Sequence, residues 1–105
     1  MIVFNTTFHI EDSVVQEAQA YLANEYIPQA MASGFLMHPK FRKVIKFEEG
    51  QKGENFCVQF HVKNIETLNL WSSQKGKQVN EALMHRFGQK VVGFSTLLDE
   101  LKWEQ

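Results

Sequence analysis

Two stretches of alternating pattern decide the fold: IVFNTTFH at residues 2–9 and NFCVQFHV at residues 55–62. Val, Ile, Phe and Thr dominate both, a composition typical of β-strands. If the stretches are antiparallel neighbours in the simplest register, the numbers of paired residues sum to about 64. Ile2, Phe4, Thr6 and Phe8 then lie opposite Val62, Phe60, Val58 and Phe56. Paired residues share a face of the sheet, so this nearly apolar face should lie under helices.

A helix is expected between these strands, starting at about residue 13. Ser13 and Gln16 fit a capping box, and Val15, Ala18, Leu22 and Tyr26 follow at near-helical spacing. Pro28 interrupts the pattern because it lacks a backbone donor, so we expect a kink there. Gly34 should end a short continuation in a left-handed conformation.

The remaining elements follow in the same way. Charged residues alternate over residues 41–49, which predicts an exposed edge strand, followed by a turn at 50–53. Asn64 is placed to cap a second helix that ends at Gly88, and Gly76 weakens it enough to allow a local break between residues 72 and 76. Residues 91–98 form the last strand, and residues 99–105 are a tail that should dock on something.

The predicted order is βαββαβ, which is the ferredoxin-like fold with a four-stranded antiparallel sheet in the order 4-1-3-2. The class is α+β. With 105 residues, the chain is the size of one domain, covering residues 1–105.

Composition excludes several classes of protein. The formal net charge is −1 and the basic residues are dispersed, so we expect no nucleic-acid partner. Residues 1–5 lack the basic residues of a signal peptide, and no apolar run approaches the length of a membrane span. A cytoplasmic protein is the expectation. The single Cys57 excludes an internal disulfide and a four-cysteine zinc site.

The opposite face of the predicted sheet is mildly polar and uncharged. It carries Asn5, Thr7, Gln59 and His61, together with Val3, His9, Asn55 and Cys57. We expect Gly93 and Ser95 of the last strand to join this face. Neutral polar residues of this kind are typical of a surface that packs against a partner sheet or lines a small cavity. A homodimer is therefore predicted, and the alternative is a solvated face.

Three stretches carry a family resemblance: NTTFHIE at residues 5–11, QFHVKN at 59–64 and RFGQKVVGF at 86–94. They resemble a small bacterial family described only as a domain of unknown function. The resemblance implies a dimeric α+β barrel, in which two ferredoxin-like sheets pack face to face. It implies no activity. That architecture is also shared, more distantly, with cofactor-independent antibiotic-biosynthesis monooxygenases and haem-degrading monooxygenases, which is an analogy of fold alone.

The monooxygenase analogy calls for an Asn on the first strand and a Trp and a His on the second helix. Asn5, Trp71 and His85 are present, but Trp71 and His85 lie about 21 Å apart along a helix. Asn5 also points away from the helices in the predicted register. We therefore expect Trp71 to be a core residue and His85 to be solvated.

No metal or cofactor site is expected. His9, His38, His61 and His85 show no metal-ligand spacing, and His9 and His61 should lie about 20 Å apart. Cys57 and His61 share a face but are separated by about 13 Å, which is too far for a nucleophile and its base.

Two functions remain open, together with a third possibility, that the domain supplies only dimerisation and stability. The leading hypothesis is a homodimeric domain that binds a small molecule or a protein partner without catalysis, through Asn5, Thr7, Gln59, His61 or Trp71. The alternative is a small cofactor-independent monooxygenase-like oxidoreductase with a pocket between sheet and helices near Trp71.

Overall fold

The two central strands pair as the sequence predicts. In a computed structural model, which describes residues 1–104, β1 (Ile2–Ile10) is antiparallel to β3 (Glu54–Val62). Phe4 lies opposite Phe60 and Asn5 opposite Gln59, the register predicted from the alternation. Residue 105, the last of the predicted tail, lies outside the described residues.

Two edge strands complete the sheet, in the order β2-β3-β1-β4. β2 (Leu36–Lys43) pairs with β3, and β4 (Val91–Asp99) pairs with β1, all antiparallel. The order is the predicted 4-1-3-2 read from the other edge, so the ferredoxin-like α+β fold is confirmed.

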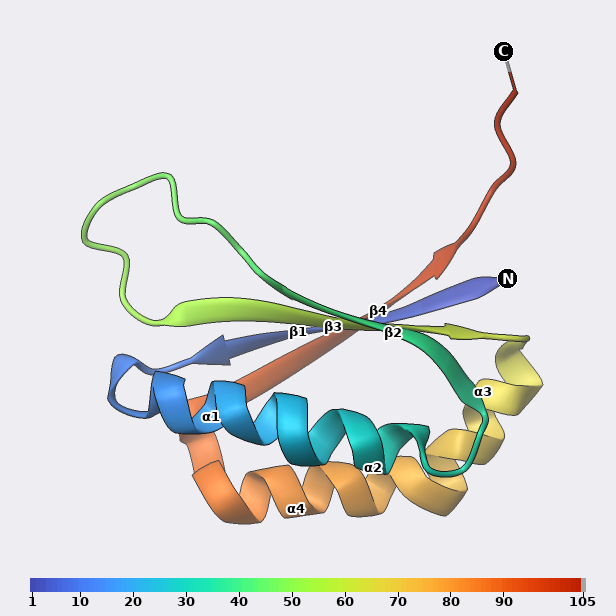
Figure 1. The fold of residues 1–105 in the computed structure, drawn as a ribbon, viewed down its shortest axis with the longest axis horizontal. Helices are drawn as coiled ribbons and strands as arrows, with labels where there is room; N and C mark the ends of the chain where they lie inside the picture. The colour runs from blue at the N-terminus through green and yellow to red at the C-terminus, as the bar shows by residue number, and fades with distance from the viewer. Residues whose placement is uncertain (105) are drawn as a thin grey trace.

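The helices cover one face of the sheet only (Figure 1). Phe8 contacts Tyr26 and Phe4 contacts Trp71, with ring centroids 5.3 and 5.6 Å apart in edge-to-face geometry. These contacts assign the even-numbered residues of β1 to the helical side, as predicted. The core lies in this layer and includes Phe56, Val58, Phe60 and Val62 of β3, which are all buried.

The first helical segment differs from the prediction at its start. A 3-10 turn at Asp12–Val14 leads into α1 (Val15–Tyr21), and Ser13 makes no capping hydrogen bond, so the capping box is wrong. The regular α-helix is interrupted by a π-helical turn at Leu22–Tyr26 just before Pro28, and the predicted short continuation is α2 (Ile27–Met31), with Pro28 in its first turn. A proline lacks the backbone N–H that an α-helix needs for its hydrogen bond to the preceding turn. The π-helical turn already departs from α-helical hydrogen bonding at this point, so the helical segment accommodates the proline.

The second helical segment follows the prediction closely. The Asn64 side chain accepts a hydrogen bond from the Thr67 amide at 2.8 Å and caps α3 (Ile65–Trp71). A π-helical turn occupies Ser72–Gly76, where the break was predicted, and α4 (Lys77–Phe87) follows. A Cβ on Gly76 would lie 2.7 Å from the Trp71 ring, so glycine is required for that ring to pack against the helix. Among the described residues, no helix is long and apolar enough to cross a membrane.

The predicted strand over residues 41–49 is largely wrong. β2 begins at Leu36 and ends at Lys43, and its pairing shifts between Met37 and Lys40. His38 takes a positive φ of 52° beside Pro39, which gives a β-bulge. An edge strand tolerates a proline at a bulge because the missing donor would face away from the sheet. Residues 44–53 form a long loop that contains the predicted turn.

Candidate functional site

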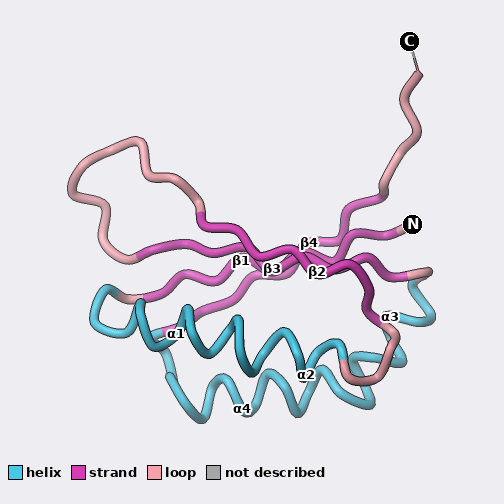
Figure 2. The backbone as a smooth tube through the Cα atoms, in the orientation of Figure 1, coloured by secondary structure: helices cyan, strands magenta, loops and turns pink. Residues whose placement is uncertain are grey.

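The face of the sheet turned away from the helices is the candidate site, and we call it the open face. Figure 2 shows the sheet with every helix on its other side. The pairings place residues of all four strands on it. The members are Val3, Asn5, Thr7 and His9 on β1, Met37, Lys40 and Arg42 on β2, Asn55, Cys57, Gln59 and His61 on β3, and Val92, Phe94, Thr96 and Leu98 on β4.

Four of the five predicted site residues lie together here. Asn5 is paired with Gln59, and Thr7 and His61 flank that pair on the same strands. All four are half-buried. Trp71 is not part of this set, because it lies in the core on the helical side of the sheet.

A line of hydrogen bonds crosses the centre of the open face. The Asn5 side-chain amide donates to the Thr7 hydroxyl at 3.3 Å, and that hydroxyl lies 3.5 Å from the Cys57 sulfur. Cys57 is half-buried. The Asn5 Oδ1 atom is buried and accepts no hydrogen bond from any described residue. Buried polar atoms normally have a partner, so this oxygen is an unsatisfied acceptor at the centre of the open face.

A second polar group lies toward the β2 edge. Arg42 donates to the Gln59 side-chain oxygen at 3.0 Å. His61 lies between His38, whose ring centroid is 5.4 Å away, and a Glu100 carboxylate oxygen 3.7 Å from its Nε2. Sequence reasoning missed the contribution of His38, because the bulge that turns it toward His61 has no clear signal apart from the adjacent proline.

β4 gives the open face an apolar edge. Val92, Phe94 and Leu98 are all exposed there. Gly93 and Ser95, predicted to lie on this face, lie on the helical side instead. Gly93 packs against the Phe8 ring, and the Ser95 hydroxyl is 3.0 Å from that of Thr6. The assignment was wrong by one residue, which in a strand reverses every side chain.

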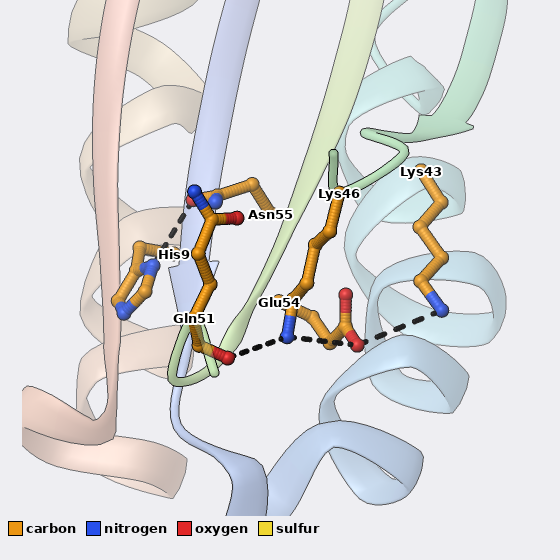
Figure 3. A network of polar contacts seen from close by, with 6 residues as sticks. All are labelled: His9, Lys43, Lys46, Gln51, Glu54 and Asn55. Atoms are coloured by element: carbon orange, nitrogen blue, oxygen red, sulfur yellow. Dashed lines mark hydrogen bonds and ion pairs between the residues drawn. The ribbon is translucent and has the colours of Figure 1, made fainter. Parts of the chain in front are cut away.

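The loop at residues 44–53 is anchored to the sheet at its base (Figure 3). Lys43 and Lys46 lie 3.8 and 3.4 Å from a Glu54 carboxylate oxygen, and Lys46 donates to the Gln51 carbonyl at 3.0 Å. On the open face, His9 Nδ1 is 3.0 Å from the Asn55 side-chain oxygen. These contacts fix where the loop leaves the sheet.

Trp71 is packed too closely to line a pocket between sheet and helices. Its side chain is 2% exposed, and its indole N–H donates to the Ala30 carbonyl at 2.9 Å. His85 is exposed on α4, as expected. The described residues include no group of three or more His, Cys, Asp or Glu placed to hold a metal ion.

The open face can therefore bind by hydrogen bonding and apolar contact. It offers amides, hydroxyls, imidazoles and a thiol, bordered by the aliphatic and aromatic side chains of β4. The Cys57 thiol contacts a hydroxyl and no histidine, so the described contacts do not form a nucleophile–base pair.

Residues 1–101 match the family model described as Domain of unknown function (DUF4286). The chain belongs to this family. Its membership confirms the resemblance found in the sequence. None of the curated proteins compared with the DUF4286 chain matches it.

Solved structures with the same fold include monooxygenase-type proteins. A putative antibiotic biosynthesis monooxygenase from Deinococcus radiodurans is 17% identical with a TM-score of 0.66, covering 100% of the DUF4286 chain and 97% of its own. A variant of MhuD with two manganese protoporphyrin IX molecules bound per active site is 15% identical with a TM-score of 0.63, covering 100% and 98%. At these identities the likeness shows the fold alone.

A third solved structure bears on assembly. It is a dimeric ferredoxin-like protein of unknown function from Thermobifida fusca YX, 12% identical with a TM-score of 0.55. The match covers 93% of the DUF4286 chain and 92% of that chain.

Proposed function

We propose that this protein is a homodimer in which two open faces pack together and enclose a binding site for a small polar molecule, without catalysis. The observation that carries the proposal is the exposure of β4. Its pairing with β1 leaves an apolar edge strand uncovered, with Phe94 65% exposed. A long uncovered apolar edge strand promotes aggregation, so proteins normally cover one.

The composition at the centre of the open face supports a partner sheet as the cover. Asn5, Thr7, Cys57 and Gln59 are neutral, so burying them against a second copy does not require desolvating a charge. The unpartnered Asn5 Oδ1 supports a donor group from the partner or from a ligand held between the sheets. The dimeric neighbour from Thermobifida fusca supports the same assembly.

A substitution on β4 tests the dimer. Sedimentation equilibrium at micromolar concentration should give twice the chain mass of 12.2 kDa for the unmodified protein and 12.2 kDa for Phe94→Asp, because the carboxylate would be buried without a partner. Met84→Asp is the matched control, since Met84 is 64% exposed but lies on α4, on the other side of the sheet. A 12.2 kDa species for the unmodified protein would contradict the proposal.

A second measurement tests the ligand. Native mass spectrometry of the purified dimer should show a mass above that of two chains, by the mass of one or two small molecules. Asn5→Leu with Gln59→Leu should lose this excess, because the two side chains supply hydrogen bonds at the centre of the open face. Asn80→Leu, an exposed position on α4, should retain it. A dimer that never carries excess mass argues against the binding site and leaves the dimer standing.

The monooxygenase alternative has weaker support. It rests on the names of neighbours below 20% identity, and its pocket between sheet and helices is occupied by the packed Trp71 side chain. We therefore propose binding rather than oxidation.

A further inference from the structure

We propose that two protruding segments of each chain clasp the second copy: the loop at residues 44–53 and the tail at residues 100–104, here called the arms. The inference rests on the proposed homodimer and extends it. In this arrangement the arms, as well as the open face, contact the second copy.

The arms carry the most exposed apolar side chains among the described residues. Ile45 and Phe47 in the loop are 79% and 98% exposed, and Leu101 and Trp103 in the tail are 74% and 79% exposed. A single exposed apolar residue needs no explanation, but four on two projecting segments form a surface that water disfavours. Two of them are aromatic, the kind of residue that dominates the energetics of protein interfaces.

Both arms rise on the same side of the sheet, away from the helices (Figures 1 and 2). They stand at opposite ends of the strands. The loop leads into the start of β3, whereas the tail follows the end of β4, where Asp99 lies opposite Ile2. A second copy seated on the open face would therefore lie between the two arms, and the apolar arm residues would continue the apolar surface of β4.

Among the described residues, the contacts that hold each arm lie near its base. The Val44 amide donates to the Asn55 carbonyl at 2.8 Å, next to the Glu54 ion pairs (Figure 3). The Glu100 amide donates to the Met1 carbonyl at 3.2 Å, and the Glu100 side chain lies beside His61. Each arm thus has a defined direction while its apolar residues remain uncovered within the chain.

Charge identifies the second copy as the occupant. The β2 edge carries Lys40 and Arg42 on the open face, both exposed, with no acidic residue between 36 and 43. The end of β4 and the tail carry Asp99, Glu100 and Glu104 against a single basic residue. In a two-fold dimer the same contact occurs twice, so each acidic tail can meet the basic β2 edge of the other copy. Glu48, Glu49 and Glu104 beside the apolar residues disfavour an anionic membrane as the occupant.

Arm variants test the clasp through the dimer dissociation constant. Ile45→Ser with Phe47→Ser, and separately Leu101→Ser with Trp103→Ser, should each raise this constant by about tenfold or more in sedimentation equilibrium of the full chain. Leu70→Ser with Met84→Ser is the matched control, because these exposed apolar residues lie on the helices. It should leave the constant unchanged.

Fluorescence gives an independent reading. Dilution of the unmodified dimer should shift tryptophan emission to longer wavelength as Trp103 becomes exposed to water. Trp103→Phe should abolish the shift, because Trp71 is already buried within the chain.

The outcomes separate the two proposals. If Phe94→Asp is monomeric while both arm variants keep the unmodified dissociation constant, the clasp is wrong and the dimer stands. If the unmodified protein is monomeric, both are wrong. Binding of the monomer to phosphatidylserine vesicles, lost in the arm variants, would overturn the clasp in favour of a membrane.

Discussion

Replacing Trp71 with alanine is expected to lower the free energy of unfolding by about 3–5 kcal/mol, the range for removing a large aromatic side chain from a core. The Trp71 ring packs edge-to-face on Phe4 and against the backbone of Gly76. Because Gly76 has no side chain, it cannot fill the cavity that the alanine would leave. The Ala30 carbonyl would also lose its indole donor. Urea denaturation at one fixed protein concentration measures the change, which keeps any contribution from dimerisation constant.

Leu70→Ala is the control for this experiment, because Leu70 is the preceding residue of α3 and is exposed. Its substitution should change the free energy of unfolding by less than about 1 kcal/mol. Equal losses for the two variants would show that Trp71 is not the anchor that the packing indicates.

The second large effect concerns alkaline pH. Burial, and secondarily the nearby Tyr21, raises the pKa of Tyr26 from 10.0 to about 12. The folded state therefore holds the phenolic proton more tightly than the unfolded state. The stabilisation is fully present below pH 10 and is lost as the pH rises from about 10 through about 12. A difference of about two pKa units corresponds to about 3 kcal/mol.

A conservative substitution isolates this effect. Tyr26→Phe keeps the ring that packs on Phe8 but removes the titrating group, so its free energy of unfolding should decline less between pH 10 and 12. Tyr21→Phe is the control. Burial also raises the pKa of Tyr21, but less strongly, so this variant should keep most of the decline. Identical pH profiles for the Tyr26 variant and the unmodified protein would contradict the assignment.

The parts of the fold that could be predicted are those with a clear sequence pattern. The register of β1 with β3 followed from two strands whose apolar residues must share one face, and the break before Gly76 followed from glycine in a helical pattern. β2 starts five residues and ends six residues before the predicted strand, and it runs through Pro39. A proline disfavours a central strand but is tolerated in an edge strand at a bulge. No single-residue signal distinguishes those cases.

The candidate site was predictable to the same extent. Asn5, Thr7, Gln59 and His61 lie together because their strands and register were right. The side chains of β4 were assigned to the wrong faces, because its pairing with β1 was not constrained by an equally clear pattern. The tail was expected to dock on something, but the protruding loop at residues 44–53 was missed for a different reason. Exposure of an apolar residue depends on where its backbone leaves the sheet, and local composition does not specify that path.

The two π-helical turns have a consequence for how this chain can change over evolutionary time. α1 begins at residue 15 and α3 at residue 65, and the π turns begin at 22 and 72, so both halves of the chain carry the same irregularity at the same interval. Each π turn amounts to one extra residue, and one residue rotates the helix that follows by about 100°. The Tyr21 and Phe87 rings pack edge-to-face, so the two helical segments contact each other. Deleting one residue from either π turn is therefore expected to turn the buried side chains of the following helix away from the core.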